Sequence, residues 1–190
     1  MELVEGVATV ESVDAFVERL GAIGDEHGVT VQAFDARYIV DRRHLDRAVE
    51  LADRAIDRGE NVARDRAVEI LCYVAGRRQI ERALEMGVSA GEGPAVVLAD
   101  ERAGEGSAGR AAETPAGGAT DVPSEPTAAE REAAESVRSR QPLDPAATLG
   151  EYGPDLVRAF FDVEQAELAA ADGDLPALVH ERVALLDVEK

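Results

Sequence analysis

The residues best suited to chemistry in this 190-residue sequence lie at one turn that begins with a glycine. They are Gly76, Arg77, Arg78, Gln79 and Ile80. The two guanidinium groups can hold phosphate, while the amide and the aliphatic side chain suit the edge and the face of a base. We expect a buried strand to end at Gly76 and a helix to follow, so that N–H groups of the first helical turn also attract an anion. The alternative is a solvated turn whose arginines pair with Glu81, Glu85 or other local carboxylates.

Further basic residues lie near the ends of other predicted elements. Arg42 and Arg43 precede a helix, and Arg64 precedes the strand that leads to Gly76. Because these arginines occur in an acidic chain, their placement favours one face that binds a polyanion.

The sequence contains few motifs of catalysis or cofactor binding. It has no phosphate-binding loop of the Gly-x-x-x-x-Gly-Lys type, no dinucleotide-binding glycine pattern after a strand, no nucleophile elbow and no paired-histidine metal motif. Cys72 could be a nucleophile with His44 as its base, but a small apolar side chain in a buried strand is the better interpretation. The single cysteine and three separated histidines argue against a structural metal site. We therefore expect no catalytic residues, no cofactor and no metal.

The excess of acidic residues indicates the kind of solvent in which the protein works more directly than it indicates a binding partner. Asp and Glu number 39 against 20 Lys and Arg, which gives a net charge of −19. Such carboxylates hold water and counter-ions, and at molar ionic strength their repulsion is screened over about 3 Å, so the composition is typical of a halophilic protein. No apolar run approaches the roughly 20 residues that span a bilayer. We expect a cytoplasmic protein with no membrane partner.

The predicted elements alternate between strands and helices. They are strands at 3–10, 29–34, 67–75, 94–99 and 183–188, and helices at 13–27, 44–58, 77–86, 155–168 and after Asp174. Residues 67–75 are nearly continuous apolar and β-prone, which is typical of a central strand buried on both faces. The pattern predicts an α/β fold of the mixed α+β type, with a mixed, partly antiparallel sheet flanked by helices.

Residues 101–147 are predicted to form a flexible, acidic insertion rich in Gly, Ala and Pro. From 103 to 129, 21 of 27 residues are Ala, Gly, Pro, Ser or Thr. Such a stretch buries too little surface to offset its ordering entropy. Thr127 begins a capping-box pattern for a short helix, but this helix lacks the large apolar residues that would dock it. One globular domain is therefore predicted from 1–100 and 148–190.

Three segments carry a resemblance to a known family. They are 38–45 (YIVDRRHL), 69–84 (EILCYVAGRRQIERAL) and 181–188 (ERVALLDV). In order and spacing they resemble the PRPK-binding protein family, the smallest widespread subunit of the KEOPS complex. The Gly-x-Arg-Gln-Ile block is the most specific part. The resemblance covers about 1–100 and 148–190.

The resemblance implies a non-catalytic accessory subunit. It implies docking on the small atypical kinase/ATPase of KEOPS and, through that kinase, a link to the threonylcarbamoyltransferase subunit. The complex installs threonylcarbamoyl on adenosine 37 of tRNAs that read ANN codons, and the archaeal members are also implicated in holding the tRNA 3′-CCA end. The residues alone also allow a free-standing regulatory α/β domain whose Arg77 and Arg78 bind a small anionic metabolite.

The candidate RNA-binding residues follow from the turn and this resemblance. We assign 76–80 to the RNA 3′ end and Arg42, Arg43 and Arg64 to flanking phosphates. The candidate kinase-binding residues are Leu156, Val157, Phe160 and Phe161. The two adjacent phenylalanines point about 100° apart on a helix, so we expect one to enter the core and the other to contact the partner.

Overall fold

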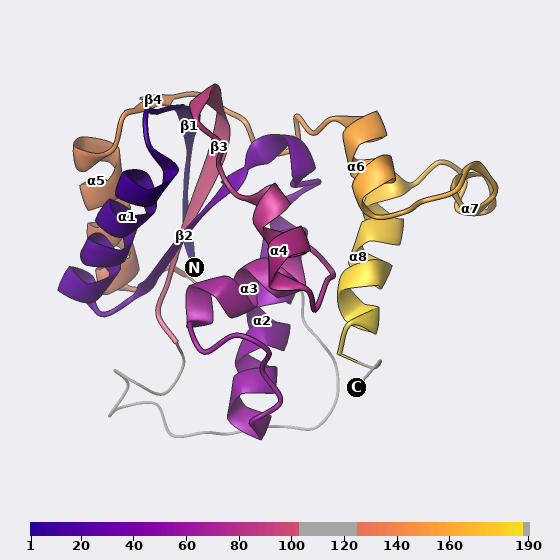
Figure 1. Ribbon diagram of the computed structural model, residues 1–190, viewed down its shortest axis with the longest axis horizontal. Helices are drawn as coiled ribbons and strands as arrows, with labels where there is room; N and C mark the ends of the chain where they lie inside the picture. Colours follow the sequence, from indigo (N-terminus) through magenta and orange to yellow (C-terminus); the bar gives the residue numbers. More distant parts are fainter. Residues whose placement is uncertain (103–124, 188–190) are drawn as a thin grey trace.

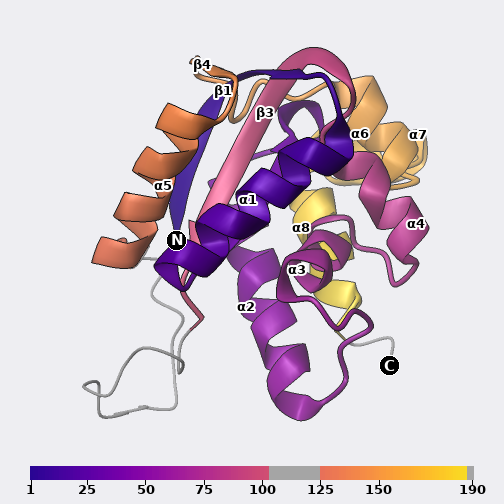
Figure 2. The same ribbon diagram turned by 60° about the vertical axis from the view of Figure 1, so that its left-hand side comes forward.

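Helices cover both faces of an antiparallel sheet, as Figures 1 and 2 show. The computed structural model describes residues 1–102 and 125–187. Its elements are β1 (Glu2–Val10), α1 (Val13–His27), β2 (Thr30–Asp35), η1 (Ala36–Tyr38), α2 (Arg42–Arg58), α3 (Arg66–Val74), α4 (Ile80–Ala83), η2 (Leu84–Met86), β3 (Gly91–Asp100), α5 (Ala128–Arg140), β4 (Leu143–Pro145), α6 (Pro154–Phe160), α7 (Gln165–Ala170) and α8 (Leu175–Leu185). The predicted mixture of helices and strands is confirmed.

The sheet has the strand order β2-β3-β1-β4, and every pairing in the described part is antiparallel. Side chains alternate between the two faces of a strand. In β3, Val96 and Leu98 therefore enter one hydrophobic core, while Val97 and Ala99 enter the other. The sheet thus separates two cores.

Helices α1 and α5 cover one face of the sheet (Figure 2). The apolar stripe of α1 buries Phe16, Leu20 and Ile23. Ser12 caps this helix by accepting a hydrogen bond from the N–H of Ala15 (3.3 Å). The predicted start of the helix is therefore confirmed.

Helix α5 corrects the prediction that all of 101–147 lies outside the globular part. Its Ala133, Ala134 and Val137 are fully buried in the core shared with α1. Docking needs no large side chains here, because small residues let the helix approach the sheet and α1 closely. Residues 128–145 thus belong to the domain, and the expectation of a flexible insertion falls largely on 103–124, outside the described residues.

Helices α2, α3, α6 and α8 surround the larger core on the other face (Figure 1). The apolar side of α2 faces this core, with Leu45, Ala52 and Ala55 fully buried. From α8, Val179 and Val183 pack into the same core. This half of the molecule also carries the turn at 76–80.

The segment 67–75, predicted as a strand, is helix α3, so that prediction is wrong. Asp65 caps the helix by accepting a hydrogen bond from the N–H of Val68 (3.1 Å). Every residue from Glu69 to Val74 is buried. A helix buried on nearly all sides has no polar face, so its sequence lacks the 3.6-residue period and resembles a buried strand.

Two predictions near the C-terminus are also wrong. The expected helix 155–168 is broken into α6 and α7, because the chain turns at Asp162, which has a φ of +53°. The expected strand 183–188 is instead the last turn of α8 as far as Leu185, and Val188 lies outside the described residues. The apolar residues of this segment continue the four-residue helical spacing of Leu175, Val179 and Val183.

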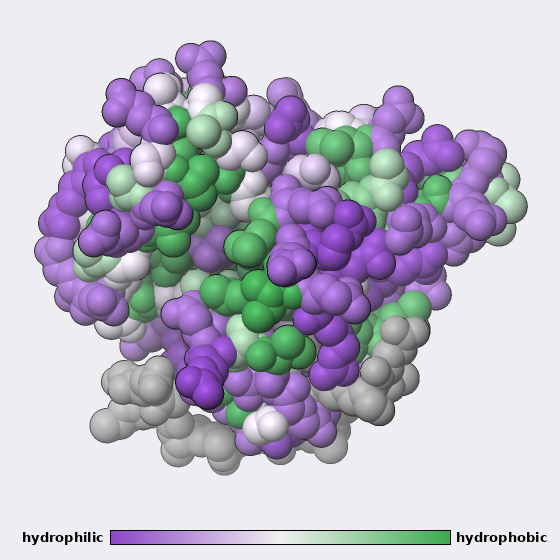
Figure 3. Space-filling model, in the orientation of Figure 1, coloured by the Kyte–Doolittle hydropathy of each residue, from purple (hydrophilic) through white to green (hydrophobic). Residues whose placement is uncertain are grey.

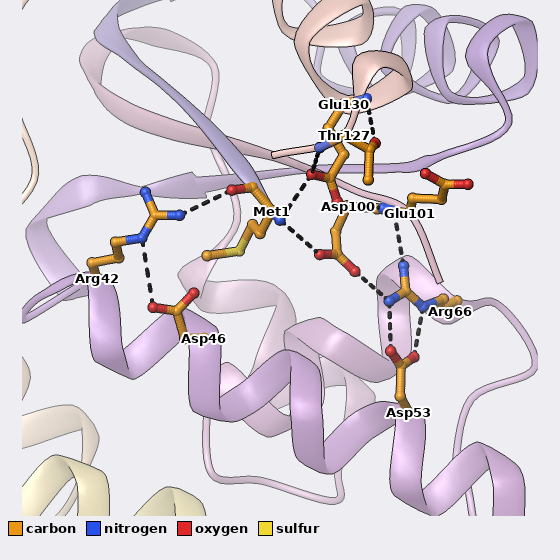
Figure 4. A network of polar contacts seen from close by, with 9 residues as sticks. All are labelled: Met1, Arg42, Asp46, Asp53, Arg66, Asp100, Glu101, Thr127 and Glu130. Carbon is orange, nitrogen blue, oxygen red and sulfur yellow. Dashed lines mark hydrogen bonds and ion pairs between the residues drawn. The ribbon is translucent and has the colours of Figure 1, made fainter. Parts of the chain in front are cut away.

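A polar network joins the start of β1 to both helical layers (Figure 4). The Met1 amine lies 3.0 Å from a Glu130 carboxylate oxygen and 3.4 Å from a carboxylate oxygen of Asp100. Asp100 and Asp53 both bind the guanidinium of Arg66, at 2.5 and 2.7 Å. Burial disfavours the charge on Arg66, but the two carboxylates outweigh it and raise the pKa of its guanidinium.

In the part of the chain that the structure describes, none of the helices combines the length and the apolar character needed to span a bilayer.

Candidate functional site

The turn after α3 is built on a left-handed glycine. Gly76 has a φ of +58°, its N–H donates to the Tyr73 carbonyl and the N–H of Arg77 donates to the Cys72 carbonyl, both at 3.0 Å. These two bonds form the Schellman motif that ends helices. The arginines therefore follow the negative end of the α3 dipole, where cations are favourable. The predicted strand-to-helix turn is wrong, because α3 is a helix and the next helix, α4, begins only at Ile80 and has 4 residues, so no helix N-terminus lies at the two arginines.

The Arg77 side chain is bound to the end of α6. Its Nη2 donates to the carbonyl oxygen of Phe160 and to a carboxylate oxygen of Asp162, both at 2.6 Å. The guanidinium carbon also lies 5.8 Å from the centre of the Phe160 ring. Arg77 is thus ion-paired, but its partner is distant in sequence and is neither Glu81 nor Glu85, the local carboxylates of the alternative interpretation.

A small, shallow recess lies beside this turn. It is lined by Val62, Glu69, Cys72, Tyr73, Arg77, Arg78 and Leu186. Glu69 is buried, and its carboxylate accepts hydrogen bonds from the N–H groups of Val62 (3.0 Å) and Ala63 (2.7 Å). These bonds fix the loop that forms one wall. Apolar side chains, two arginines and the Glu69 carboxylate thus line the recess together.

The remaining residues of the turn reach the surface. Arg78 is partly buried in the wall of the recess, whereas Gln79 is exposed. Ile80 is 36% exposed, and Leu84, one helical turn later, is 55% exposed. Figure 3 shows apolar residues at the surface near the middle of the face that is turned toward the viewer, between hydrophilic areas. A guanidinium, an amide and apolar surface thus follow one another along 78–84, which suits contact with both a phosphate and a base.

The other predicted basic residues lie in different surroundings. Arg42 donates to the carbonyl oxygen of Met1 (2.9 Å) and pairs with Asp46 at 3.6 Å, so it belongs to the polar contacts at the start of β1 (Figure 4). Arg43 and Arg64 are exposed. Arg64 stands two positions after Val62, which lines the recess, and is the better placed of the two for a flanking phosphate.

The four predicted kinase-binding residues are mostly core residues. Val157 is fully buried, Phe160 is 5% exposed and Phe161 is 2% exposed, while Leu156 is partly buried. The expectation that one phenylalanine remains for a partner is therefore wrong. Helix α6 ends at Phe160, so the 100° spacing no longer applies to the residue after it.

Both phenylalanine rings have partners inside the molecule. The Phe160 ring packs edge-on against Tyr38, with centroids 5.2 Å apart, and Phe161 packs edge-on against His44 at 5.9 Å. The two rings also meet each other at 5.2 Å. They hold the end of α6 against the turn at Gly76, where the Phe161 ring lies within 3.5 Å of the position of an added Cβ.

The two residues considered for nucleophilic catalysis are both buried. Burial and the nearby charge of Glu69 raise the pKa of the Cys72 thiol to about 11, so it is protonated at neutral pH. Burial lowers the pKa of His44 to about 4, and its Nε2 lies 2.8 Å from the carbonyl oxygen of Val74. In the described residues, no group of three or more His, Cys, Asp or Glu side chains could hold a metal ion.

Several residues around the turn are not evident from the sequence pattern. Glu69 is the only acidic residue within 67–75, and an isolated acid in an apolar run is a usable sign of a specific polar contact. Leu186 and Asp162 give no such sign, because both are brought to the turn by the tertiary fold. The residues that the sequence did predict at this site are 76–80.

The comparisons with known proteins identify the family. One family model matches residues 9–187 of this domain, in which a sheet lies between two helical layers and a basic turn lies beside a recess. The chain therefore belongs to a family of kinase-binding proteins. That family is the kinase binding protein CGI-121 family, which confirms the resemblance seen in the sequence. No curated protein matches the chain.

Proposed function

We propose that this protein is a non-catalytic accessory subunit of a cytoplasmic, archaeal KEOPS complex. It binds the small atypical kinase/ATPase of that complex and, through the kinase, is linked to the threonylcarbamoyltransferase subunit. At the turn 76–80 it holds the 3′-CCA end of tRNA while adenosine 37 of tRNAs reading ANN codons is modified.

Membership of the kinase-binding family is the observation that carries the proposal. The buried positions of Cys72 and His44 support an accessory role, because neither side chain is presented to a substrate. The resemblance in the Gly-x-Arg-Gln-Ile block supports the tRNA half, together with the recess that adjoins the turn.

The geometry suggests a division of roles at the turn. Arg78 and Gln79 contact phosphate and base edges, and Ile80 supports the terminal base. Arg77, anchored on Phe160, presents its guanidinium at the rim of the recess. Arg64 contacts a flanking phosphate.

Binding to the purified partner kinase tests the first half. Calorimetric titration of the chain into the kinase, in molar KCl, should give a saturable complex. Because α6 is a core helix, Phe160→Glu should lose kinase binding only together with the folded state, which circular dichroism would reveal. A folded wild-type chain that does not bind the kinase would overturn the proposal.

Binding of intact and CCA-trimmed tRNA tests the second half. Arg78→Glu and Ile80→Glu should each weaken binding of intact tRNA by about tenfold, because a stacked base is worth about 1–3 kcal/mol. Arg47→Glu is a matched control with the same change of charge, since Arg47 lies on α2 and pairs with Glu50. Kinase binding should be unchanged in all three variants. If Arg78→Glu and Arg47→Glu bind tRNA equally, the turn is not the RNA site.

A further inference from the structure

The guanidinium of Arg77 already holds a carboxylate. Its Nη2 lies 2.6 Å from Oδ2 of Asp162, and the same nitrogen donates to the carbonyl oxygen of Phe160. The Asp162 side chain is 72% exposed and that of Arg77 is 26% exposed. The ion pair is therefore open to solvent, and its arginine also lines the recess.

We infer that Asp162 is an internal counter-ion of the RNA site, and that RNA phosphate binds Arg77 by displacing this carboxylate. The inference rests on the proposed function, because it concerns regulation of the same turn. A carboxylate and a phosphate oxygen compete for the same guanidinium N–H groups. An exposed ion pair contributes only a little stability, so displacing the carboxylate costs little free energy. The negative charge of the carboxylate nevertheless repels an approaching phosphate.

Two further contacts keep Arg77 in place when Asp162 is displaced. The bond to the Phe160 carbonyl and the position over the Phe160 ring, at 5.8 Å, do not involve the carboxylate. Loss of the Asp162 charge should therefore free the guanidinium for phosphate without releasing the side chain. The carboxylate thus competes with every anion for Arg77, and only an anion that binds more strongly, or from a better position, displaces it.

The backbone at Asp162 provides a matched pair of variants. Asp162 has a φ of +53°, and Asp172 has a φ of +52° at the other end of the α7 segment. Asparagine tolerates this left-handed conformation as well as aspartate does, so Asn variants at both positions remove one negative charge with little backbone strain. Asp172 is exposed, and no ion pair joins it to the turn within the described residues.

The test is the affinity for intact tRNA, measured by fluorescence anisotropy at two salt concentrations. Asp162→Asn should bind tRNA about two- to fivefold more tightly than the wild type, whereas Asp172→Asn should change the affinity much less. In an Arg77→Gln background the gain from Asp162→Asn should fall to that of the control. The gain should also be smaller at the higher salt concentration.

The outcomes separate this inference from the proposed function. If wild-type protein binds tRNA and Asp162→Asn equals Asp172→Asn, the counter-ion inference is wrong while the RNA site stands. Weaker binding by Asp162→Asn also overturns it, since Asp162 would then position Arg77. If no variant binds tRNA, both the inference and the RNA half of the proposed function are wrong.

Discussion

The Nε2 atom of His44 lies 2.8 Å from the carbonyl oxygen of Val74, which joins the first turn of α2 to the end of α3. A carbonyl oxygen only accepts hydrogen bonds, so Nε2 carries the proton and Nδ1 is the unprotonated nitrogen. Nδ1 is buried and has no hydrogen-bond partner among the described residues. A second proton would therefore place a positive charge in an apolar environment beside the ring of Phe161.

This arrangement predicts a loss of stability in mild acid. Burial lowers the pKa of His44 to about 4 in the folded chain, against an ordinary value of 6.5. As the pH falls below 6.5, the unfolded chain takes up a proton that the folded chain does not, so stability is lost until the pH reaches about 4. The full loss is about 3 kcal/mol at roughly 1.4 kcal/mol per pH unit.

Urea unfolding at several pH values between 7 and 4 measures this effect. Carboxylates also titrate in this range, so the quantity to compare is the pH slope of the wild type against that of His44→Gln. The glutamine amide can still donate to the Val74 carbonyl but does not titrate. The variant should show the shallower slope, and equal slopes would contradict the prediction.

Removal of the Arg66 side chain should strongly destabilise the fold. Its side chain is 12% exposed, and its guanidinium binds both Asp53 and Asp100. Arg66→Met removes the cation that these two carboxylates share, at an expected cost of about 3–5 kcal/mol. Arg47→Met is the matched control, because its exposed pair with Glu50 should contribute less than about 1 kcal/mol. Similar midpoints for the two variants in urea unfolding would refute the role of Arg66.

A methyl group at Gly6 should separate β4 from the sheet. An added Cβ would lie 2.5 Å from the carbonyl oxygen of Asp144 and 2.8 Å from the Leu143 side chain. We expect Gly6→Ala to cost about 1–3 kcal/mol by overpacking. Gly93→Ala on β3 is the control, since nothing lies within 4 Å of its added Cβ. The free energy of unfolding of both variants checks the prediction. Equal losses would contradict it, because the close approach of β4 to Gly6 would then not account for the loss of stability.

Residues 104–124 should be dispensable for folding. Their composition offers little apolar surface, and loop-closure entropy changes by only about 0.6 kcal/mol per doubling of length. Replacement by a flexible Gly/Ser linker of about ten residues should shift the thermal midpoint by about 2–4 °C at most. Loss of the cooperative transition would show instead that the segment supports the fold.

Local signals in the sequence were sufficient for the amphipathic helices α1 and α2 and for the strands β1, β2 and β3. Ser12 and Gly28 mark the ends of α1, and both act there as caps, Gly28 with a φ of +66°. These signals work because capping depends on a few neighbouring residues. They failed for α3, whose uniform burial comes from packing on α2, β2 and α4, and uniform burial removes the period that distinguishes a helix from a strand.

The candidate site could be predicted only as a segment. The residues 76–80 were found because glycine and arginine are informative on their own. The contact of Arg77 with Asp162 spans 85 positions, and no local pattern encodes it. The burial of both Phe160 and Phe161 likewise depends on where α6 ends against Tyr38 and His44, which is a property of the tertiary packing.

Glu130 joins the chain just after β3 to the chain just before α5. Its Oε1 accepts from the N–H of Glu101 and its Oε2 from the N–H of Thr127, both at 2.9 Å. Burial opposes ionisation of this carboxylate, but these bonds and the Met1 amine outweigh it and lower its pKa. One side chain thus fastens the point where the chain leaves the fold to the point where it returns. We therefore expect this junction to accept a reporter domain in place of the intervening residues, because the carboxylate joins the two ends.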